Sequence, residues 1–159
     1  MKQHTTNYTD TLIEIAEDCP VSQAQIPPEK KTKTLANLQY EKLIKQPYQY
    51  SSDDLIFECY AIKNDLSESE KQSEREKFFS KGQPCLRCSP LAKKYGFGFH
   101  HNSEGKVALI PVESEEYQIL LNDRSVAKTK AMRSKKKMIE KMNDSFQFNE
   151  YYSFEKISF

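Results

Sequence analysis

All four glycines of this 159-residue chain lie between residues 82 and 105. Glycine tolerates a positive φ angle and lets another group approach the backbone closely. Two of the three histidines and two of the four cysteines also fall within residues 82–112. The sequence therefore concentrates backbone freedom, thiols and imidazoles in one stretch, and we expect a functional site to lie there.

The composition fits one small domain with a modest core. Hydrophobic residues make up 37% of the chain, and nine Tyr and nine Phe offer large apolar surfaces to bury. The formal net charge of +1 gives no overall attraction to nucleic acid or to a membrane surface. No apolar run has the length of a membrane span, and the N-terminus lacks the apolar region of a signal peptide. We expect a cytoplasmic protein with free thiols and no membrane contact.

The first part of the chain predicts a strand and a loop. Leu12, Ile13 and Ile15 favour an extended backbone over residues 8–16. Two adjacent prolines then favour a loop without helix over residues 21–33.

Helix signals follow in five places, where Ser or Thr can cap the first free amides. The expected helices cover about residues 34–45, 55–63, 67–80, 89–95 and 113–121. In residues 55–63 the apolar alternation also fits a strand. We favour a mostly buried helix there, because acidic capping residues precede it and complement the helix dipole.

The clearest local pattern is a β-hairpin. Residues 97–101 and 106–112 are the two expected strands, and Gly105 suits a left-handed position in the loop between them. With the first strand, the hairpin predicts an α+β fold in which a small antiparallel sheet is covered by several helices. We expect a single domain over residues 1–137 and a C-terminal extension over residues 138–159, with a helical end and an aromatic arm.

The glycines beside His100 predict a ligand or partner site on the hairpin. Because side chains alternate across a strand, Gly96, Gly98 and His100 should share the face opposite Phe97. Bare backbone beside an imidazole leaves space for a small molecule or a protein partner. The expected ligand contacts are Arg87, Gly96, Phe97, Gly98 and His100. The alternative is that a helix of the protein itself packs there and that His100 is an ordinary hydrogen-bonded residue.

An enzyme with a thiol nucleophile is a second hypothesis. Cys85 would attack a substrate and His100 would take the thiol proton, while Glu113 or Glu14 orients the imidazole. Arg87 could then bind an anionic group of the substrate. The alternative is that Cys85 is a small buried apolar residue and that Arg87 pairs with a nearby carboxylate.

Cys85 and Cys88 also form a C-x-x-C motif, which suggests a redox pair or half of a zinc site. A structural zinc site needs four converging ligands, whereas His100 and His101 would point to opposite faces of a strand. A redox pair of this kind usually follows a parallel βαβ pattern, which is missing before the motif. We therefore expect neither a metal nor a cofactor.

The segment 125–141 is rich in lysine and arginine. It could contact nucleic acid through charge alone, although no recognised nucleic-acid motif accompanies it. The alternatives are a solvated terminal helix, or docking through an apolar stripe formed by Met132, Met138, Ile139 and Met142.

Several short sequence motifs together resemble those of one family. They are residues 5–8, 17–20, 52–54, 64–66, 79–85, 89–91, 95–98 with His100, 105–106, 112–114 and 130–134. From about His4 to about Lys136 the chain resembles a family of short bacterial proteins whose function is unknown, so the resemblance implies no activity. The family leads us to expect tryptophan at Phe97 and no cysteine at Cys88. The second departure leaves Cys85 as the more interesting thiol.

Overall fold

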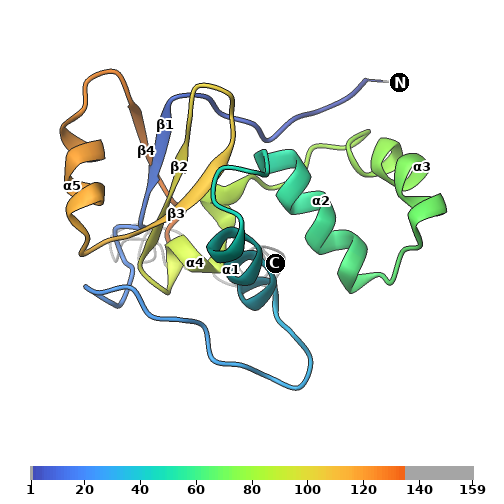
Figure 1. Cartoon of the computed structure of the whole chain (residues 1–159), viewed down its shortest axis with the longest axis horizontal. Coiled ribbons are helices and arrows are strands. Elements are labelled where there is room, and N and C mark those ends of the chain that lie inside the picture. Colours follow the sequence, from blue (N-terminus) through green and yellow to red (C-terminus); the bar gives the residue numbers. More distant parts are fainter. Residues whose placement is uncertain (1, 135–159) are drawn as a thin grey trace, which may run out of the picture.

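A four-stranded mixed sheet forms the centre of the protein (Figure 1). The computed structural model describes residues 2–134, and every structural statement below concerns those residues. The elements are β1 (Thr11–Glu14), α1 (Leu35–Lys45), α2 (Ser52–Lys63), α3 (Glu68–Phe78), a 3₁₀ turn η1 (Leu86–Cys88), α4 (Pro90–Lys93), β2 (Phe97–His101), β3 (Val107–Pro111), α5 (Glu115–Asn122) and β4 (Ala127–Lys130). The strand order is β3-β2-β1-β4. The predicted α+β fold, with the first strand and the hairpin in one sheet, is confirmed.

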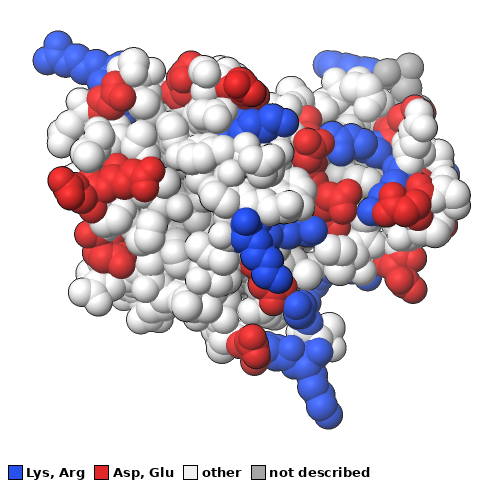
Figure 2. Space-filling model, in the orientation of Figure 1, with Lys and Arg blue, Asp and Glu red and all other residues white. Residues whose placement is uncertain are grey.

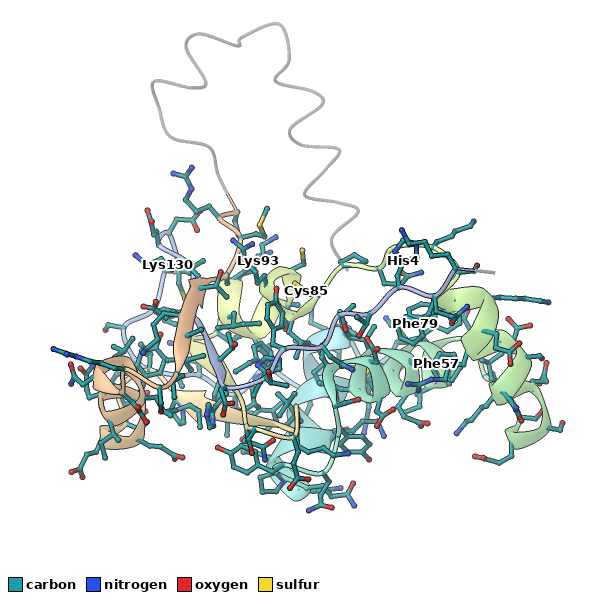
Figure 3. The ribbon with its side chains drawn as sticks, turned by 90° about the horizontal axis from the view of Figure 1, so that it is seen from above. His4, Phe57, Phe79, Cys85, Lys93 and Lys130 are labelled. Carbon is teal, nitrogen blue, oxygen red and sulfur yellow. The ribbon has the colours of Figure 1, made fainter. Side chains whose placement is uncertain are left out.

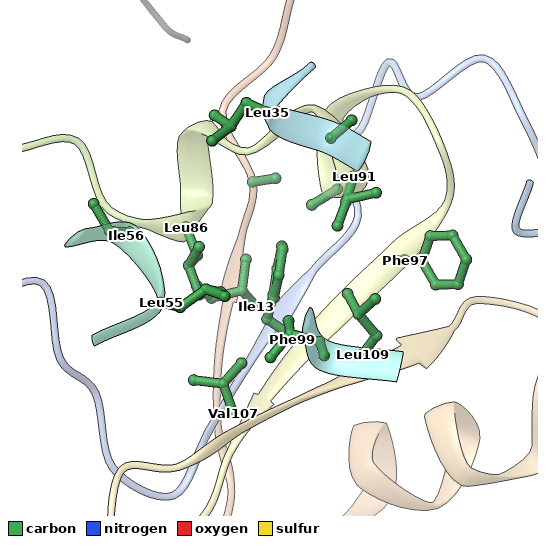
Figure 4. Close-up of a cluster of buried hydrophobic side chains, with 14 of the residues drawn as sticks. Ile13, Leu35, Leu55, Ile56, Leu86, Leu91, Phe97, Phe99, Val107 and Leu109 are labelled. Carbon is green, nitrogen blue, oxygen red and sulfur yellow. The ribbon is translucent and has the colours of Figure 1, made fainter. Parts of the chain in front are cut away.

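Different helices cover the two faces of the sheet. Ile13 and Phe99 point toward α1, α4 and the start of α2, where they join the larger core (Figure 4). Leu12 and Ile110 point the other way, toward Tyr117 of α5. This division follows from the alternation of side chains along a strand. Both faces of β2 are consequently covered by the protein's own helices.

Side-chain caps explain where the helices begin. The Thr34 hydroxyl accepts a hydrogen bond from the backbone N–H of Asn37, and the Asn37 side chain accepts one from the Thr34 backbone. Ser51 caps α2 by accepting from the backbone N–H of Asp54, which settles the choice between helix and strand there in favour of the helix. No helix within residues 2–134 has the length and apolar character that a bilayer crossing requires.

The basic segment departs from the expected terminal helix. Residues Ala127–Lys130 form strand β4, which pairs in parallel with β1 and makes the sheet mixed. Val126 and Ala131, at the two ends of the strand, are both buried and fix it against the sheet. Residues 135–141 of the segment lie outside the described residues, as does the C-terminal extension over residues 138–159 with Met138, Ile139 and Met142.

The N-terminal segment is attached to the start of α2 through Asp53. One carboxylate oxygen of Asp53 accepts hydrogen bonds from the backbone N–H and the hydroxyl of Thr6, both at 2.7 Å. The other oxygen accepts from the Thr5 hydroxyl at 2.7 Å, and the Asn7 side chain accepts from the Asp53 N–H at 2.9 Å. Residues 5–8 and 52–54, two of the motifs that suggested the family, are thus joined by hydrogen bonds.

Replacing Asp53 by alanine should lower the free energy of unfolding by about 2–3 kcal/mol. The substitution leaves the buried Thr6 N–H and hydroxyl without their charged acceptor, and hydrogen bonds to charged groups are the stronger ones. Urea denaturation measures the loss. Glu29→Ala, at an exposed carboxylate outside this network, is the control. Equal midpoints for the two variants would show that the attachment contributes little.

Candidate functional site

The glycine patch predicted beside His100 is present, but Tyr117 of α5 fills it. A Cβ added to Gly98 would lie 2.8 Å from the Tyr117 ring carbon Cε2 and 2.9 Å from the backbone oxygen of Ile13. The backbone N–H of Ile15 donates a hydrogen bond to the Tyr117 hydroxyl at 3.0 Å and holds the ring in place. The close approach that glycine permits is therefore an approach of the protein's own helix, and a ligand has no space at this position.

The other expected ligand contacts do not converge. Gly96 is buried with a φ of +79° and packs against Val21 and Ala24. Phe97 is buried in the larger core, where its ring lies 5.6 Å from that of Tyr40. These residues support the hairpin from inside, as parts of the core.

His100 shares a hydrogen bond with Tyr48 on the α5 side of the sheet. Its Nδ1 lies 2.8 Å from the hydroxyl oxygen of Tyr48. Burial lowers the pKa of His100, and the carboxylates of Glu116, Asp10 and Asp123 offset part of that shift. A half-buried imidazole that a tyrosine holds in this way matches the ordinary structural role more closely than that of a general base.

Cys85 lies on the opposite face of the sheet. Its Sγ is 3.3 Å from the hydroxyl of Tyr8, whose ring meets the ring of His101 edge-on at 5.2 Å. Because His100 and His101 are consecutive in β2, their side chains point to opposite faces. The structure therefore does not bring Cys85 and His100 together as nucleophile and base. Glu113, a proposed orienting group, instead accepts a hydrogen bond from the Ala24 N–H.

His101 is the imidazole on the Cys85 side, and its environment keeps it neutral. The side chain is fully buried, and neither ring nitrogen has a hydrogen-bond partner among the described residues. Burial lowers the pKa of His101 to about 4. Backbone groups of Thr11 and Phe99 lie near the ring without reaching hydrogen-bonding geometry, and they offset only part of the shift.

Arg87 forms hydrogen bonds with the backbone of the protein itself. Its Nε donates to the carbonyl oxygen of Lys130 at 2.7 Å, and its own carbonyl accepts from the N–H of Met132 at 2.8 Å. These two bonds fasten the turn η1 to the end of β4. The sequence predicted an anion-binding or carboxylate-paired arginine, whereas the side chain bonds a backbone carbonyl.

The four cysteines are free thiols. Cys59 is buried, and this burial raises its pKa to about 12, so it is unreactive at neutral pH. Within residues 2–134, no three His, Cys, Asp or Glu side chains are arranged to hold a metal ion.

The structure also contains a groove at α1 that sequence reasoning missed. Its volume is about 450 Å³, within the range of about 300–1,000 Å³ that is usual for ligand pockets. The lining residues are Lys33, Leu38, Glu41, Lys42, Lys45, Gln46, Tyr50 and Ile62, and we call this the α1–α2 groove. Figure 2 shows lysine side chains gathered over α1 and the loop that precedes it.

The charges around the α1–α2 groove leave two lysines without a carboxylate. Lys33 pairs with Glu41 at 2.7 Å. Lys42 places its Nζ 5.5 Å from the centre of the Tyr50 ring, and neither it nor Lys45 forms an ion pair within the described part of the chain. The groove therefore carries a surplus of positive charge.

A signal for this groove was present in the sequence. Leu38, Lys42 and Lys45 follow an i, i+4, i+7 spacing, which places them on one face of a helix. Lysines that follow an apolar residue at this spacing indicate that the helix face is buried at its start and exposed to solvent toward its end. What the sequence did not show is that Tyr50 and Ile62, from outside the helix, complete the opposite wall.

Comparison with known proteins identifies a family and nothing more specific. A sequence model described as a family of unknown function, DUF6157, matches residues 3–137. No curated protein and no solved structure matches the chain. The matched range agrees with the resemblance from about His4 to about Lys136 and confirms it.

Proposed function

We propose that this chain, which belongs to the family of unknown function DUF6157, is a binding protein that takes an anionic ligand with an apolar part in the α1–α2 groove. The observation that carries the proposal is the pair of lysines without carboxylate partners, Lys42 and Lys45, on the wall of a concave surface. The hairpin is not the proposed binding surface, because Tyr117 fills the space at Gly98.

Charge supports the choice of an anion. Lys42 and Lys45 are one helical turn apart, so both ammonium groups can reach the same carboxylate or phosphate. Charge-assisted hydrogen bonds of this kind are stronger than neutral ones. Glu41 is already paired with Lys33, which limits its repulsion of an incoming anion.

The floor of the groove supports an apolar part of the ligand. Leu38 is buried there, while Ile62 keeps 49% of its surface exposed. Tyr50 adds an aromatic ring, and its hydroxyl donates to the Gln46 side chain at 2.7 Å. A small carboxylate or phosphate that carries a ring or a short alkyl group would cover Ile62 and meet the lysines at the same time.

The test is a calorimetric titration with phenyl phosphate at low salt. We expect saturable binding to the protein, and affinity about tenfold weaker for the Lys42→Gln/Lys45→Gln variant. Benzyl alcohol, which lacks the charge, and inorganic phosphate, which lacks the ring, should each bind more weakly than phenyl phosphate. Higher salt should weaken binding, because these lysines are close to solvent.

The matched control is Lys81→Gln/Lys94→Gln, which removes the same charge at exposed lysines outside the groove. This variant should keep the affinity of the wild-type protein. Equal losses in the two double variants would mean that only net charge matters, and the proposed site would be wrong.

Two further expectations stay proposals. The free thiols suit a reducing compartment, so we propose a cytoplasmic location. Contact with nucleic acid through residues 125–141 has less support, because its described beginning is the strand β4.

A further inference from the structure

The turn η1 holds the two cysteines of the C-x-x-C motif near each other. The backbone N–H of Cys88 donates to the carbonyl oxygen of Cys85 at 3.0 Å. This is the closure of a four-residue turn, whose first and last Cα atoms lie within about 7 Å. A disulfide needs Cα atoms about 4.4–6.8 Å apart, so the turn is compatible with one. Both residues are half-buried, so neither is enclosed in the core.

The surroundings of the two thiols differ. The Tyr8 hydroxyl lies 3.3 Å from the Cys85 Sγ, and burial together with this thiol raises the pKa of Tyr8 to about 12. Tyr8 therefore stays protonated and can donate its O–H to a thiolate at Cys85. Burial raises the pKa of Cys88, and the charge of Cys85 raises it further. Cys85 therefore has a hydrogen-bond donor that can stabilise its thiolate, while the pKa of Cys88 lies above its ordinary value.

We infer that Cys85 and Cys88 form a redox-active dithiol that exchanges with low-molecular-weight disulfides such as oxidised glutathione, with Cys85 as the attacking thiol and Cys88 as the resolving thiol. Figure 3 shows Cys85 between Lys130 of β4 and the N-terminal segment at His4. The site is separate from the α1–α2 groove and does not depend on the function proposed there.

The exchange proceeds in two balanced steps. The Cys85 thiolate attacks one sulfur of the disulfide R–S–S–R, the S–S bond breaks, and R–S⁻ leaves with the bonding electrons. The Cys88 thiolate then attacks the Cys85 sulfur of the mixed disulfide and releases the second R–S⁻. Both leaving groups take up the protons that the two cysteines gave to solvent. The protein dithiol is oxidised to a disulfide, and R–S–S–R is reduced to two thiols.

Oxidation also removes a contact of the N-terminal segment. After oxidation, Cys85 no longer carries the thiol that shares a hydrogen bond with the Tyr8 hydroxyl. The Asp53 bonds to Thr5 and Thr6 do not involve Cys85, so we expect the change to be confined to the part of the segment near Tyr8. Hydrogen exchange of this part should therefore be faster in the oxidised protein.

The experiment exposes the full chain to oxidised glutathione under native conditions, and mass spectrometry after alkylation and digestion locates every oxidised cysteine. Wild-type protein should form a Cys85–Cys88 disulfide and accumulate little mixed disulfide. Cys88→Ser should trap glutathione on Cys85. In Cys85→Ser, glutathione should modify Cys88 about tenfold more slowly than it modifies Cys85 in Cys88→Ser. Tyr8→Phe, which removes the donor to Cys85, should slow the first step several-fold.

Cys19→Ser is the matched control, because Cys19 is also half-buried but has no cysteine beside it in sequence. The Cys19→Ser variant should form the Cys85–Cys88 disulfide as fast as the wild-type protein does. A disulfide that forms only in denaturant would overturn the inference. The same holds if Cys85→Ser is modified as fast as Cys88→Ser, or if Cys19 or Cys59 becomes the partner of Cys85.

Discussion

Substituting alanine for Gly98 should lower the free energy of unfolding by about 2–3 kcal/mol. The added methyl group would sit 2.8 Å from a ring carbon of Tyr117 and 2.9 Å from the backbone oxygen of Ile13. The ring could rotate away, but the Ile13 oxygen belongs to the neighbouring strand β1 and cannot move without disturbing the sheet. Overpacking of this kind typically costs about 1–3 kcal/mol, and here two contacts are too short at once.

Gly82→Ala is the matched control. A Cβ at Gly82 would meet only the Nδ1 of His4, at 4.0 Å, which is an ordinary van der Waals separation. We expect this variant to be as stable as the wild-type protein or slightly more so, because alanine restricts the unfolded chain. Urea denaturation of the two variants gives the comparison. A Gly98→Ala protein that unfolds at the Gly82→Ala midpoint would contradict the packing of Tyr117 on β2.

Acid should destabilise the protein through His101. The pKa of this buried imidazole is about 4 in the folded protein, against 6.5 for an ordinary histidine. Between these two values the unfolded chain binds a proton that the folded chain does not, so stability falls as the pH falls from about 6.5 to about 4. A difference of 2.5 units corresponds to a loss of about 3 kcal/mol.

Two substitutions separate the titration of His101 from its packing. His101→Phe and His101→Gln both remove the titrating group, so the part of the acid destabilisation that His101 causes should vanish in both. The phenylalanine variant should also be more stable at pH 7, because it removes two buried nitrogens without partners among the described residues. Unfolding free energies at pH 7, 5.5 and 4.5 measure the effect. An unchanged pH slope in both variants would show that His101 is readily protonated in the folded state.

The local signals in the sequence located most of the elements. The caps at Thr34 and Ser51 marked the starts of α1 and α2, and the loop with Gly105 between two strand segments marked the hairpin. These signals act between residues close in sequence, so they are readable without the fold. Strand β4 was missed, because its lysines carry no strand signal and its position depends on pairing with β1.

The candidate site was predicted less well, for a related reason. Alternation along β2 correctly placed Gly98 and His100 on one face, but it could not show that Tyr117, far along the chain, would cover that face. The same alternation puts His101 rather than His100 on the side of Cys85. The wall that Tyr50 and Ile62 add to the α1–α2 groove depends in the same way on contacts distant in sequence.

The hairpin and the α1–α2 groove therefore have different roles. Phe97, Phe99 and His101 of the hairpin are almost completely buried, whereas Lys45 of α1 is exposed and Lys42 is half-buried. Binding residues commonly lie on such accessible surfaces held by a rigid scaffold.

The most direct test of the groove is the map of backbone amide chemical shifts during a titration with phenyl phosphate. We expect the shifts to change along α1, at Tyr50 and at Ile62, while the amides of β2 and β3 stay where they are. Changes centred on the hairpin residues 97–111, or none along α1, would contradict the proposal that this protein binds its ligand in the α1–α2 groove.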